Sequence, residues 1–183
     1  VKYIFSSESA FAAHKSDGTV KTGGSRNTGG NSDGVTLTSV NSVYSTLRSF
    51  AAIKEGGTVV TWGDSGYGGD SSIVSSSISS GVTTISSTWK AFAAIKAGGS
   101  VVTWGDSNSG GDSSSVSSSI SSGVTEIYST RHAFAAVKSA AVICWGPSGN
   151  GGDCSGVTIS GNVVSMASNE YAFAALTNGG DVV

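Results

Sequence analysis

The segment Ala91-Phe92-Ala93-Ala94-Ile95-Lys96, with Ala97-Gly98-Gly99 and Ser100-Val101-Val102-Thr103-Trp104 directly after it, decides the fold of this chain. Two runs rich in apolar and β-branched residues flank a Gly-Gly pair, and glycine accepts the positive φ angles of tight hairpin turns. The segment therefore predicts a β-hairpin. Its first strand is apolar on both faces, which an exposed antiparallel sheet avoids, so we expect each hairpin to pack between neighbouring sheets.

This phrase occurs five times in the sequence, and this internal repeat is the strongest signal that the sequence contains. Each copy has a phenylalanine followed by two alanines, at Phe11, Phe50, Phe92, Phe134 and Phe173. Subtraction of these positions gives spacings of 39, 42, 42 and 39 residues. Glycine follows in four of the copies, whereas the fourth copy has Ser139-Ala140-Ala141 in its place. A distorted turn is therefore expected there.

Serine-rich segments separate the hairpins. The tracts 71–80 and 113–122 carry apolar residues four positions apart, such as Val74 and Ile78, so at most one helical turn fits in each. Their equal length and regular punctuation favour ordered structure over flexible linkers. We interpret residues 1–183 as a single repeat array with approximate units 1–46, 47–88, 89–130 and 131–169 and a partial unit 170–183.

The segment 94–105, Ala-Ile-Lys-Ala-Gly-Gly-Ser-Val-Val-Thr-Trp-Gly, resembles the phrase Ala-Leu-Thr-x-Asp-Gly-x-Val-x-x-Trp-Gly of the regulator of chromosome condensation repeats. Ala175-Leu176-Thr177-Asn178-Gly179-Gly180-Asp181-Val182 is similar to it as well. Repeats of that family form a seven-bladed β-propeller of four-stranded blades. The resemblance implies an all-β fold of tandem β-propeller-type blades, four to five units long, in an incomplete or open propeller.

Departures from the family phrase mark a short, serine-rich variant. Alanine or serine stands where the family has a histidine before its Ala-Leu strand, and Gly-Gly-Asp-Ser replaces its Gly-Gln-Leu-Gly loop, as at 68–71. The first copy has Gly23 where the next three have Trp62, Trp104 and Trp145, so its blade should be the loosest.

Composition and length limit the possible functions. The chain has a net charge of −2 and 12% charged residues, so it offers no basic surplus for nucleic acid, and no apolar window is long enough for a transmembrane helix. Seven blades of about 42 residues would need about 294 residues, against 183 here. We therefore expect a segment or subunit of a larger assembly.

The two cysteines occur together in one repeat. Cys144 stands where other copies have Thr61 and Thr103, and Cys154 stands where they have serine. Paired replacements on either side of one loop suggest a disulfide, the alternative being two buried free thiols. A disulfide would favour a secreted or lumenal location, and without it the compartment is unknown. The abundant serine and threonine are compatible with O-linked glycosylation.

No catalytic, cofactor or metal constellation is evident. Asp64 and Asp70, repeated as Asp106 and Asp112, resemble calcium-binding turns, but each loop supplies two carboxylates, and aspartates that accept loop amides explain them better. His14 and His132 have no partner at metal-ligand spacing. We expect a protein that is not an enzyme and has no cofactor or metal.

Aromatic and variable positions remain as candidates for recognition. Trp62, Trp104 and Trp145 recur at a fixed repeat position, so packing between blades is preferred over a row that stacks on carbohydrate or bases. Variable side chains on a fixed scaffold are where recognition usually resides. Such side chains, which differ between copies just before the phenylalanine, are Trp89, Lys90, Arg131, His132 and Tyr171.

These observations favour a non-catalytic structural or interaction protein that binds partner proteins or further copies of itself. One alternative, by analogy of fold with the founding family member, is a guanine-nucleotide exchange factor for a small GTPase, although no insertion breaks the repeat rhythm. A second alternative is a carbohydrate-binding propeller.

Overall fold

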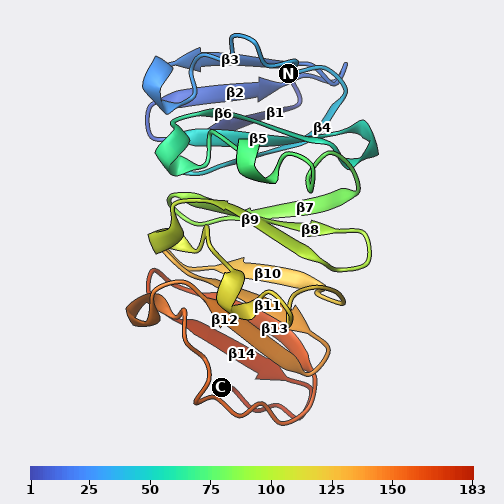
Figure 1. The fold of residues 1–183 in the computed structure, drawn as a ribbon, viewed down its shortest axis with the longest axis vertical. Helices are drawn as coiled ribbons and strands as arrows, with labels where there is room; N and C mark the ends of the chain where they lie inside the picture. The colour runs from blue at the N-terminus through green and yellow to red at the C-terminus, as the bar shows by residue number, and fades with distance from the viewer.

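The computed structural model describes residues 1–183 as a stack of five small antiparallel sheets, with the two chain ends at opposite ends of the stack (Figure 1). Sheets 1 to 4 each hold three strands in sequence order, and sheet 5 holds two. The chain is thus an all-β array of β-propeller-type blades in an open arrangement. The strands are β1 (Tyr3–Ser6), β2 (Ala10–His14) and β3 (Val20–Gly24) in sheet 1; β4 (Val40–Ser45), β5 (Ser49–Lys54) and β6 (Val59–Gly63) in sheet 2; β7 (Val82–Ser87), β8 (Ala91–Lys96) and β9 (Val101–Gly105) in sheet 3; β10 (Glu126–Ser129), β11 (Phe134–Lys138) and β12 (Ala141–Trp145) in sheet 4; and β13 (Val163–Ser168) and β14 (Phe173–Thr177) in sheet 5.

The hairpins form where the repeated phrase predicts them. In sheet 3, Phe92 pairs with Trp104 and Ile95 with Val101 across the glycine turn, where Gly99 has a φ of +77°. In sheet 4 the turn is shorter, because Lys138 pairs directly with Ala141. Ser139 there has a φ of +54°, a left-handed conformation that residues other than glycine seldom adopt. The expected distortion of this turn is therefore present.

Sheets 1 to 4 have three strands each, whereas the blades of the resembled family have four. The segment after each third strand turns back on itself and does not pair as a strand. After β6, for example, the backbone N–H groups of Tyr67 and Gly69 both donate to the carbonyl of Asp64, and the Asp64 carboxylate accepts from Gly66 N–H. These local bonds use the backbone groups that a fourth strand would need.

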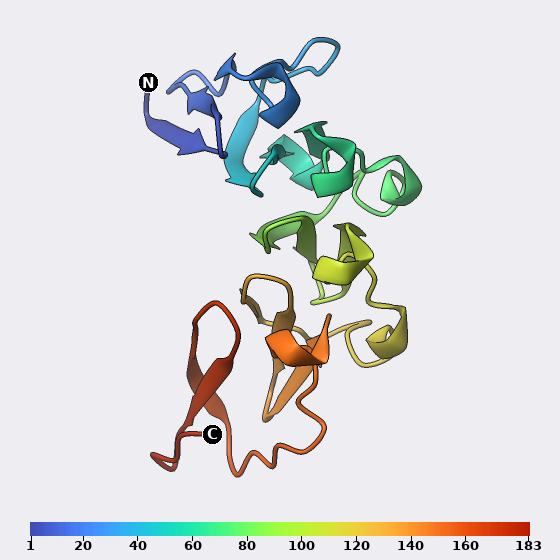
Figure 2. The ribbon, with the colours of Figure 1, turned by 90° about the vertical axis from the view of Figure 1, so that its left-hand side faces the viewer.

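The serine tracts are ordered, as their spacing predicts. They contain the 3-10 turns Ser72–Val74 and Ser114–Val116, and the following Ile78 and Ile120 are buried. Backbone bonds from Val59 to Ile78 and from Val101 to Ile120 fasten each tract to its own sheet. Figure 2 shows the two tracts on one side of the stack. All helices are single turns, and none has the length and apolar character needed to cross a membrane.

The hydrophobic core lies between the sheets. At the junction of sheets 2 and 3, Ala51 and Ile53 of β5 contact a cluster that includes Phe92, Ala94 and Trp104. Residues 49–53 of β5 and 91–95 of β8 are buried without a break, which confirms that these strands are covered on both faces. The small alanines let neighbouring sheets approach closely, and burial of each of Phe50, Phe92 and Phe134 contributes roughly 1.5–3 kcal/mol.

Each of sheets 2 to 5 draws on two successive sequence units, whereas sheet 1 lies within the first unit. The unit boundaries at 46/47, 88/89 and 130/131 fall in the turns between the first and second strands of sheets 2, 3 and 4. A unit thus supplies the last two strands of one sheet and the first strand of the next. The turns at these boundaries carry the variable side chains singled out in the sequence.

Candidate binding face

A ladder of backbone hydrogen bonds runs across all five sheets through the turns between their first and second strands. Its N–H···O distances are 2.8 Å from Glu8 to Leu47, 3.0 Å from Leu47 to Trp89, 3.0 Å from Trp89 to Arg131 and 3.1 Å from Arg131 to Glu170. Residues 39 to 42 positions apart in the sequence therefore become direct neighbours. We call this surface the ladder face; it comprises Glu8, Ser9, Leu47, Arg48, Trp89, Lys90, Arg131, His132, Glu170 and Tyr171.

A buried threonine holds each of the central turns. The Thr88 hydroxyl accepts from the N–H of Ala91 at 3.1 Å and donates to the carbonyl of Ser109 at 2.8 Å. Thr130 makes the same two bonds, with Ala133 and Asn150. The threonine thus fixes the turn to the loop that follows the third strand of its own sheet. Sequence reasoning missed this role, although a threonine four residues before the phenylalanine recurs in three copies, at Thr46, Thr88 and Thr130.

Trp89 and Arg131 form the centre of the ladder face. The guanidinium of Arg131 lies 3.3 Å from the centroid of the Trp89 ring, and it also pairs with the carboxylate of Glu170. The imidazole of His132 meets the Trp89 ring edge-on at 5.9 Å between centroids, and its Nδ1 lies 3.0 Å from the Ser109 hydroxyl. Trp89 nevertheless remains 38% exposed, so an aromatic edge is held rigidly at the surface.

The environment of His132 favours its neutral form. Partial burial is the main cause that lowers the pKa of His132 below its ordinary value, and the nearby charges of Arg131 and Lys90 lower it further. Asp106 and Glu170 oppose this effect. The imidazole is therefore better suited to hydrogen bonding than to carrying charge at neutral pH.

The other cations of the ladder face gather around one tyrosine. Arg48 and Lys90 each lie 5.1 Å from the centroid of the Tyr67 ring. Arg48 also pairs with Glu8 at 2.9 Å, and Lys90 with Asp106 at 3.7 Å. Because each cation has its own carboxylate, the face presents mixed charge and no block of positive charge.

The variable residues predicted from the sequence thus share one surface, with one of them apart from the main cluster. Arg131 and His132 both contact the Trp89 ring, and Lys90 contacts Tyr67 and Asp106. Tyr171 is 54% exposed, and its backbone N–H donates to the Asn169 side chain.

The repeated tryptophans lie between sheets. Trp62, Trp104 and Trp145 stack on Phe50, Phe92 and Phe134 with centroid distances of 5.2 to 5.3 Å. All six side chains are buried. They are packing residues and do not form an exposed row. The other two phenylalanines are less covered, since Phe11 is 56% exposed and Phe173 is half-buried.

Cys144 and Cys154 form a disulfide, with 5.7 Å between their Cα atoms. Their counterparts Thr61 and Ser71 in sheet 2 have hydroxyl oxygens 3.0 Å apart, and sheet 3 repeats this with Thr103 and Ser113. A covalent bond therefore replaces a hydroxyl hydrogen bond at the same place in the blade.

The loop aspartates act as caps. Asp70 and Asp112 each accept a hydrogen bond of 2.8 Å from the backbone N–H two residues later, and Asp153 does the same at 2.9 Å. These backbone bonds are the main cause that lowers the pKa of each carboxyl group. No group of three or more histidine, cysteine or acidic side chains is placed to hold a metal ion.

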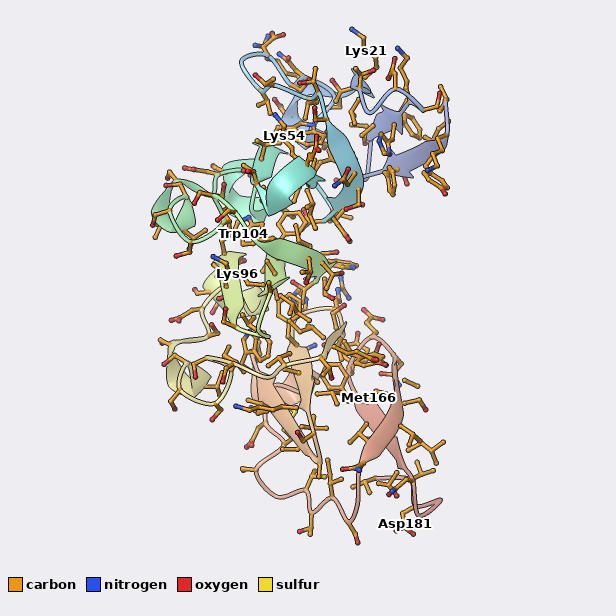
Figure 3. All side chains as sticks on the ribbon, turned by 90° about the vertical axis from the view of Figure 1, so that its right-hand side faces the viewer. Lys21, Lys54, Lys96, Trp104, Met166 and Asp181 are labelled. Atoms are coloured by element: carbon orange, nitrogen blue, oxygen red, sulfur yellow. A yellow bond between two sulfur atoms is a disulfide. The ribbon has the colours of Figure 1, made fainter.

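An apolar cleft lies between sheets 4 and 5. Cys144, Cys154, Gly151, Met166 and Phe173 are among its lining residues, and Met166 is labelled in Figure 3. At each of the three junctions between sheets 1 and 4, a tryptophan lies between the phenylalanine of its own sheet and a loop glycine of the preceding sheet.

Comparison with solved structures identifies the type of fold. No protein-family model and no curated protein matches the sequence. Among solved structures, the chain is similar to the ectodomain of the receptor kinase CR4 from Physcomitrella patens (TM-score 0.63, 14% identity, 98% of this chain and 50% of that one). It is also similar to Prp20p from Saccharomyces cerevisiae (TM-score 0.62, 15% identity, 98% and 55%). The CRINKLY WD40 ectodomain of Arabidopsis thaliana ACR4 matches as well (TM-score 0.56, 13% identity, 96% and 60%).

The chain thus spans 50 to 60% of the length of these structures. At identities of 13 to 15% the likeness shows the fold alone, a β-propeller repeat fold.

Proposed function

We propose that this chain is a non-catalytic scaffold of the regulator of chromosome condensation repeat type, and that it binds a partner protein through the ladder face. The repeat phrase at 94–105 and the likeness of the fold to Prp20p support the repeat type. Prp20p is itself described as binding Gsp1p and histones, so a fold of this kind can bind proteins.

The backbone ladder is the observation that carries the proposal. It turns one side chain from each of five repeats into a continuous column with Trp89 and Arg131 at its centre. Tryptophan, arginine and tyrosine are the residues most enriched at the energetic centres of protein interfaces. Because their turns are fixed by buried threonines, little conformational entropy is lost when a partner binds.

The details of the face favour a protein over other ligands. Each cation is paired with a carboxylate, so a polyanion finds no uncompensated positive charge. One face of the Trp89 ring is covered by Arg131, which reduces the flat aromatic surface on which a sugar could stack. Mixed charge around a rigid aromatic edge suits a polar protein surface.

Affinity capture with matched variants tests the proposal. The immobilised chain, the double variant Trp89→Ala/Arg131→Ala and the control Ile73→Ala would each be exposed to extract from the source organism, and retained proteins quantified. Ile73 is 97% exposed and lies in a serine tract away from the ladder face, so it controls for loss of a surface hydrophobe.

We expect at least one protein to be retained by the wild type and by Ile73→Ala and lost by the double variant. When that protein is purified, it should bind the wild type and Ile73→Ala with similar affinity and the double variant more weakly. Equal retention by all three chains would contradict binding through this face.

A further inference from the structure

The disulfide between Cys144 and Cys154 closes the loop that follows β12, residues 146–153, which we call the sheet 4 loop. We propose that this bond is a redox switch for the ladder face: its reduction by a thiol frees the sheet 4 loop, loosens the turn that carries Arg131 and so weakens partner binding. The inference rests on the function proposed above, because it assigns a means of regulation to the same face.

One hydrogen bond couples the sheet 4 loop to the ladder face. The carbonyl of Asn150 in this loop accepts a bond of 2.8 Å from the hydroxyl of Thr130. The same hydroxyl accepts a bond of 3.0 Å from the N–H of Ala133, which closes the turn around Arg131 and His132. Thr130 is buried, so water does not readily replace a partner that its hydroxyl loses. Movement of the loop therefore acts directly on the turn.

This turn holds the central side chain of the ladder face. The guanidinium of Arg131 lies over the Trp89 ring. The backbone N–H of Arg131 donates to the carbonyl of Glu170, and its carbonyl accepts from the N–H of Trp89. A shift of the turn therefore disturbs both the stacked guanidinium and two successive bonds of the ladder.

The sheet 4 loop lacks the side-chain bonds that close its counterparts in sheets 2 and 3. In those sheets Asp64 and Asp106 begin the loop, and each carboxylate accepts a backbone N–H two residues later. Pro147 stands at this position in sheet 4 and makes no such bond. The cysteines also replace the bonded hydroxyl pair, such as Thr103 and Ser113, and thiols form only weak hydrogen bonds. Without the disulfide, neither kind of closure remains.

Proline also removes a direct link between the loop and the turn. In sheet 3 the N–H of Asp106 donates a bond of 3.0 Å to the carbonyl of Lys90 on the ladder face, and sheet 2 has the same bond. Pro147 has no N–H, so this bond cannot form in sheet 4. The bond between Thr130 and Asn150 is therefore the one hydrogen bond that joins this loop to its turn.

The disulfide lies where a reductant can reach it. Cys144 and Cys154 are both partly exposed. The residues at the same positions in sheets 2 and 3 are partly exposed as well, namely Thr61, Ser71, Thr103 and Ser113. This exposure is therefore common to these blades. The chain has no other cysteine, so the electrons must come from an external thiol.

Reduction consumes two thiol groups of the reductant. A thiolate of the reductant attacks one cysteine sulfur, the bond between Cys144 and Cys154 breaks, and a mixed disulfide forms. A second thiolate attacks the mixed disulfide and releases the cysteine. Two electrons pass to the protein, each cysteine sulfur takes up one proton, and the reductant leaves as a disulfide. Exchange with an oxidised thiol restores the bond, so the switch is reversible.

Amide hydrogen exchange, measured by nuclear magnetic resonance on the 183-residue chain, tests the coupling without a partner. After reduction with dithiothreitol, we expect the N–H of Ala133 to exchange about two- to tenfold faster, as for the loss of one hydrogen bond. The N–H of Ala91 is the internal control, because it bonds to Thr88 in the same way in a blade without a disulfide. Its exchange rate should not change.

Two results of this measurement would overturn the proposal. Unchanged exchange at Ala133 would show that the loop does not control the turn. Equal acceleration at Ala91 and Ala133 would show that reduction loosens the whole chain and not this turn in particular.

Two variants test the assigned cause. Pro147→Asp restores the carboxylate and the N–H of the counterpart loops, and it suits the backbone, since φ is −63° at Pro147 and −67° at Asp106. Reduction should accelerate exchange at Ala133 less in this variant than in the wild type. Cys144→Thr/Cys154→Ser should not respond to the reductant. A full response of Pro147→Asp, or any response of the double variant, would contradict the proposal.

Partner binding is measured with the protein that the wild type retains in the capture experiment above. The reduced wild type should bind it about two- to tenfold more weakly than the oxidised wild type, and Pro147→Asp should lose less affinity on reduction. If reduction leaves the affinity of the ladder face unchanged, the switch is wrong and the proposed function stands. If no protein binds this face, the proposed function fails, and exchange at Ala133 still decides whether the disulfide controls the turn.

Discussion

The indole Nε1 of Trp104 donates a hydrogen bond of 3.1 Å to the carbonyl of Gly68, 36 residues earlier in the preceding sheet. Trp62 and Trp145 make the same bond to Gly29 and Gly110. The glycine is needed there for two reasons, because Gly68 has a φ of +87° and a Cβ at this position would lie 2.8 Å from the Phe92 ring. Each of the three junctions between sheets 1 and 4 is therefore fastened by one tryptophan and one glycine.

Gly68→Ala should destabilise the chain more than Gly98→Ala. Gly98 has a similar φ of +92°, but a Cβ added there would meet no atom within 4 Å, so both variants incur the left-handed penalty of about 1–2 kcal/mol. The collision with Phe92 should add about 1–3 kcal/mol for Gly68 alone. Urea unfolding measures both values. Equal losses would show that the ring moves aside at no cost.

Trp104→Phe should lower the free energy of unfolding by about 1–3 kcal/mol, because the buried Gly68 carbonyl loses its donor. Phenylalanine keeps an aromatic ring against Phe92 but is smaller than tryptophan, so the lost hydrogen bond and a small cavity both contribute to the change. Trp89→Phe on the ladder face is the matched control and should change stability by less than about 0.5 kcal/mol. Similar effects at the two sites would contradict the role assigned to Trp104.

The sequence alone was sufficient for the hairpins and for the stacking of sheets. An apolar strand such as 91–95, with no polar face, must be covered on both sides, and a glycine pair after it must turn. The four-stranded blade typical of the resembled family does not occur here, since sheets 1 to 4 have three strands each. The local bonds that Asp64 makes within its loop prevent a fourth strand, and residue types alone do not rank such bonds against strand pairing.

The ladder face could be predicted only in part. The variability of Trp89 and Arg131 between copies marked them as candidates, but their contact depends on backbone bonds between residues 42 positions apart. Such bonds form only once the sheets are stacked at the observed spacing. The threonine that holds each turn, such as Thr88, was missed because serine and threonine are so abundant that its fixed position did not stand out.

Replacing the disulfide by its counterpart hydroxyls should weaken the chain. The double variant Cys144→Thr/Cys154→Ser restores the residues found in sheets 2 and 3, and it removes a covalent link across a sequence separation of 10. The expected loss is about 2–3 kcal/mol, since the link restricts the unfolded chain. Unfolding with and without a reducing agent provides the check: the reductant should destabilise the wild type and leave the variant unchanged.

The reverse exchange should create a new disulfide in sheet 3. The hydroxyl oxygens of Thr103 and Ser113 lie 3.0 Å apart in the position that corresponds to Cys144 and Cys154. Thr103→Cys/Ser113→Cys in the background without the native cysteines should therefore oxidise readily, and mass spectrometry after alkylation would detect the bond. Thr103→Cys/Ser117→Cys, which moves one cysteine to the serine after the 3-10 turn, is the control expected to keep two free thiols.

The stability of the wild type should fall on acidification from about pH 6.5 in a way that depends on His132. Burial, aided by Arg131 and Lys90, lowers its pKa below 6.5 in the folded chain. Between 6.5 and that lowered value the unfolded chain binds more protons, so the free energy of unfolding decreases as pH falls. The contribution of neutral His132 is complete above pH 6.5 and is lost as pH falls through the folded pKa.

His132→Gln, which keeps a hydrogen-bonding side chain without titrating, should flatten this part of the stability curve. Nuclear magnetic resonance of the imidazole protons of His132 measures its pKa directly. A midpoint at or above 6.5, or identical pH profiles for the wild type and His132→Gln, would contradict the environment assigned to this residue.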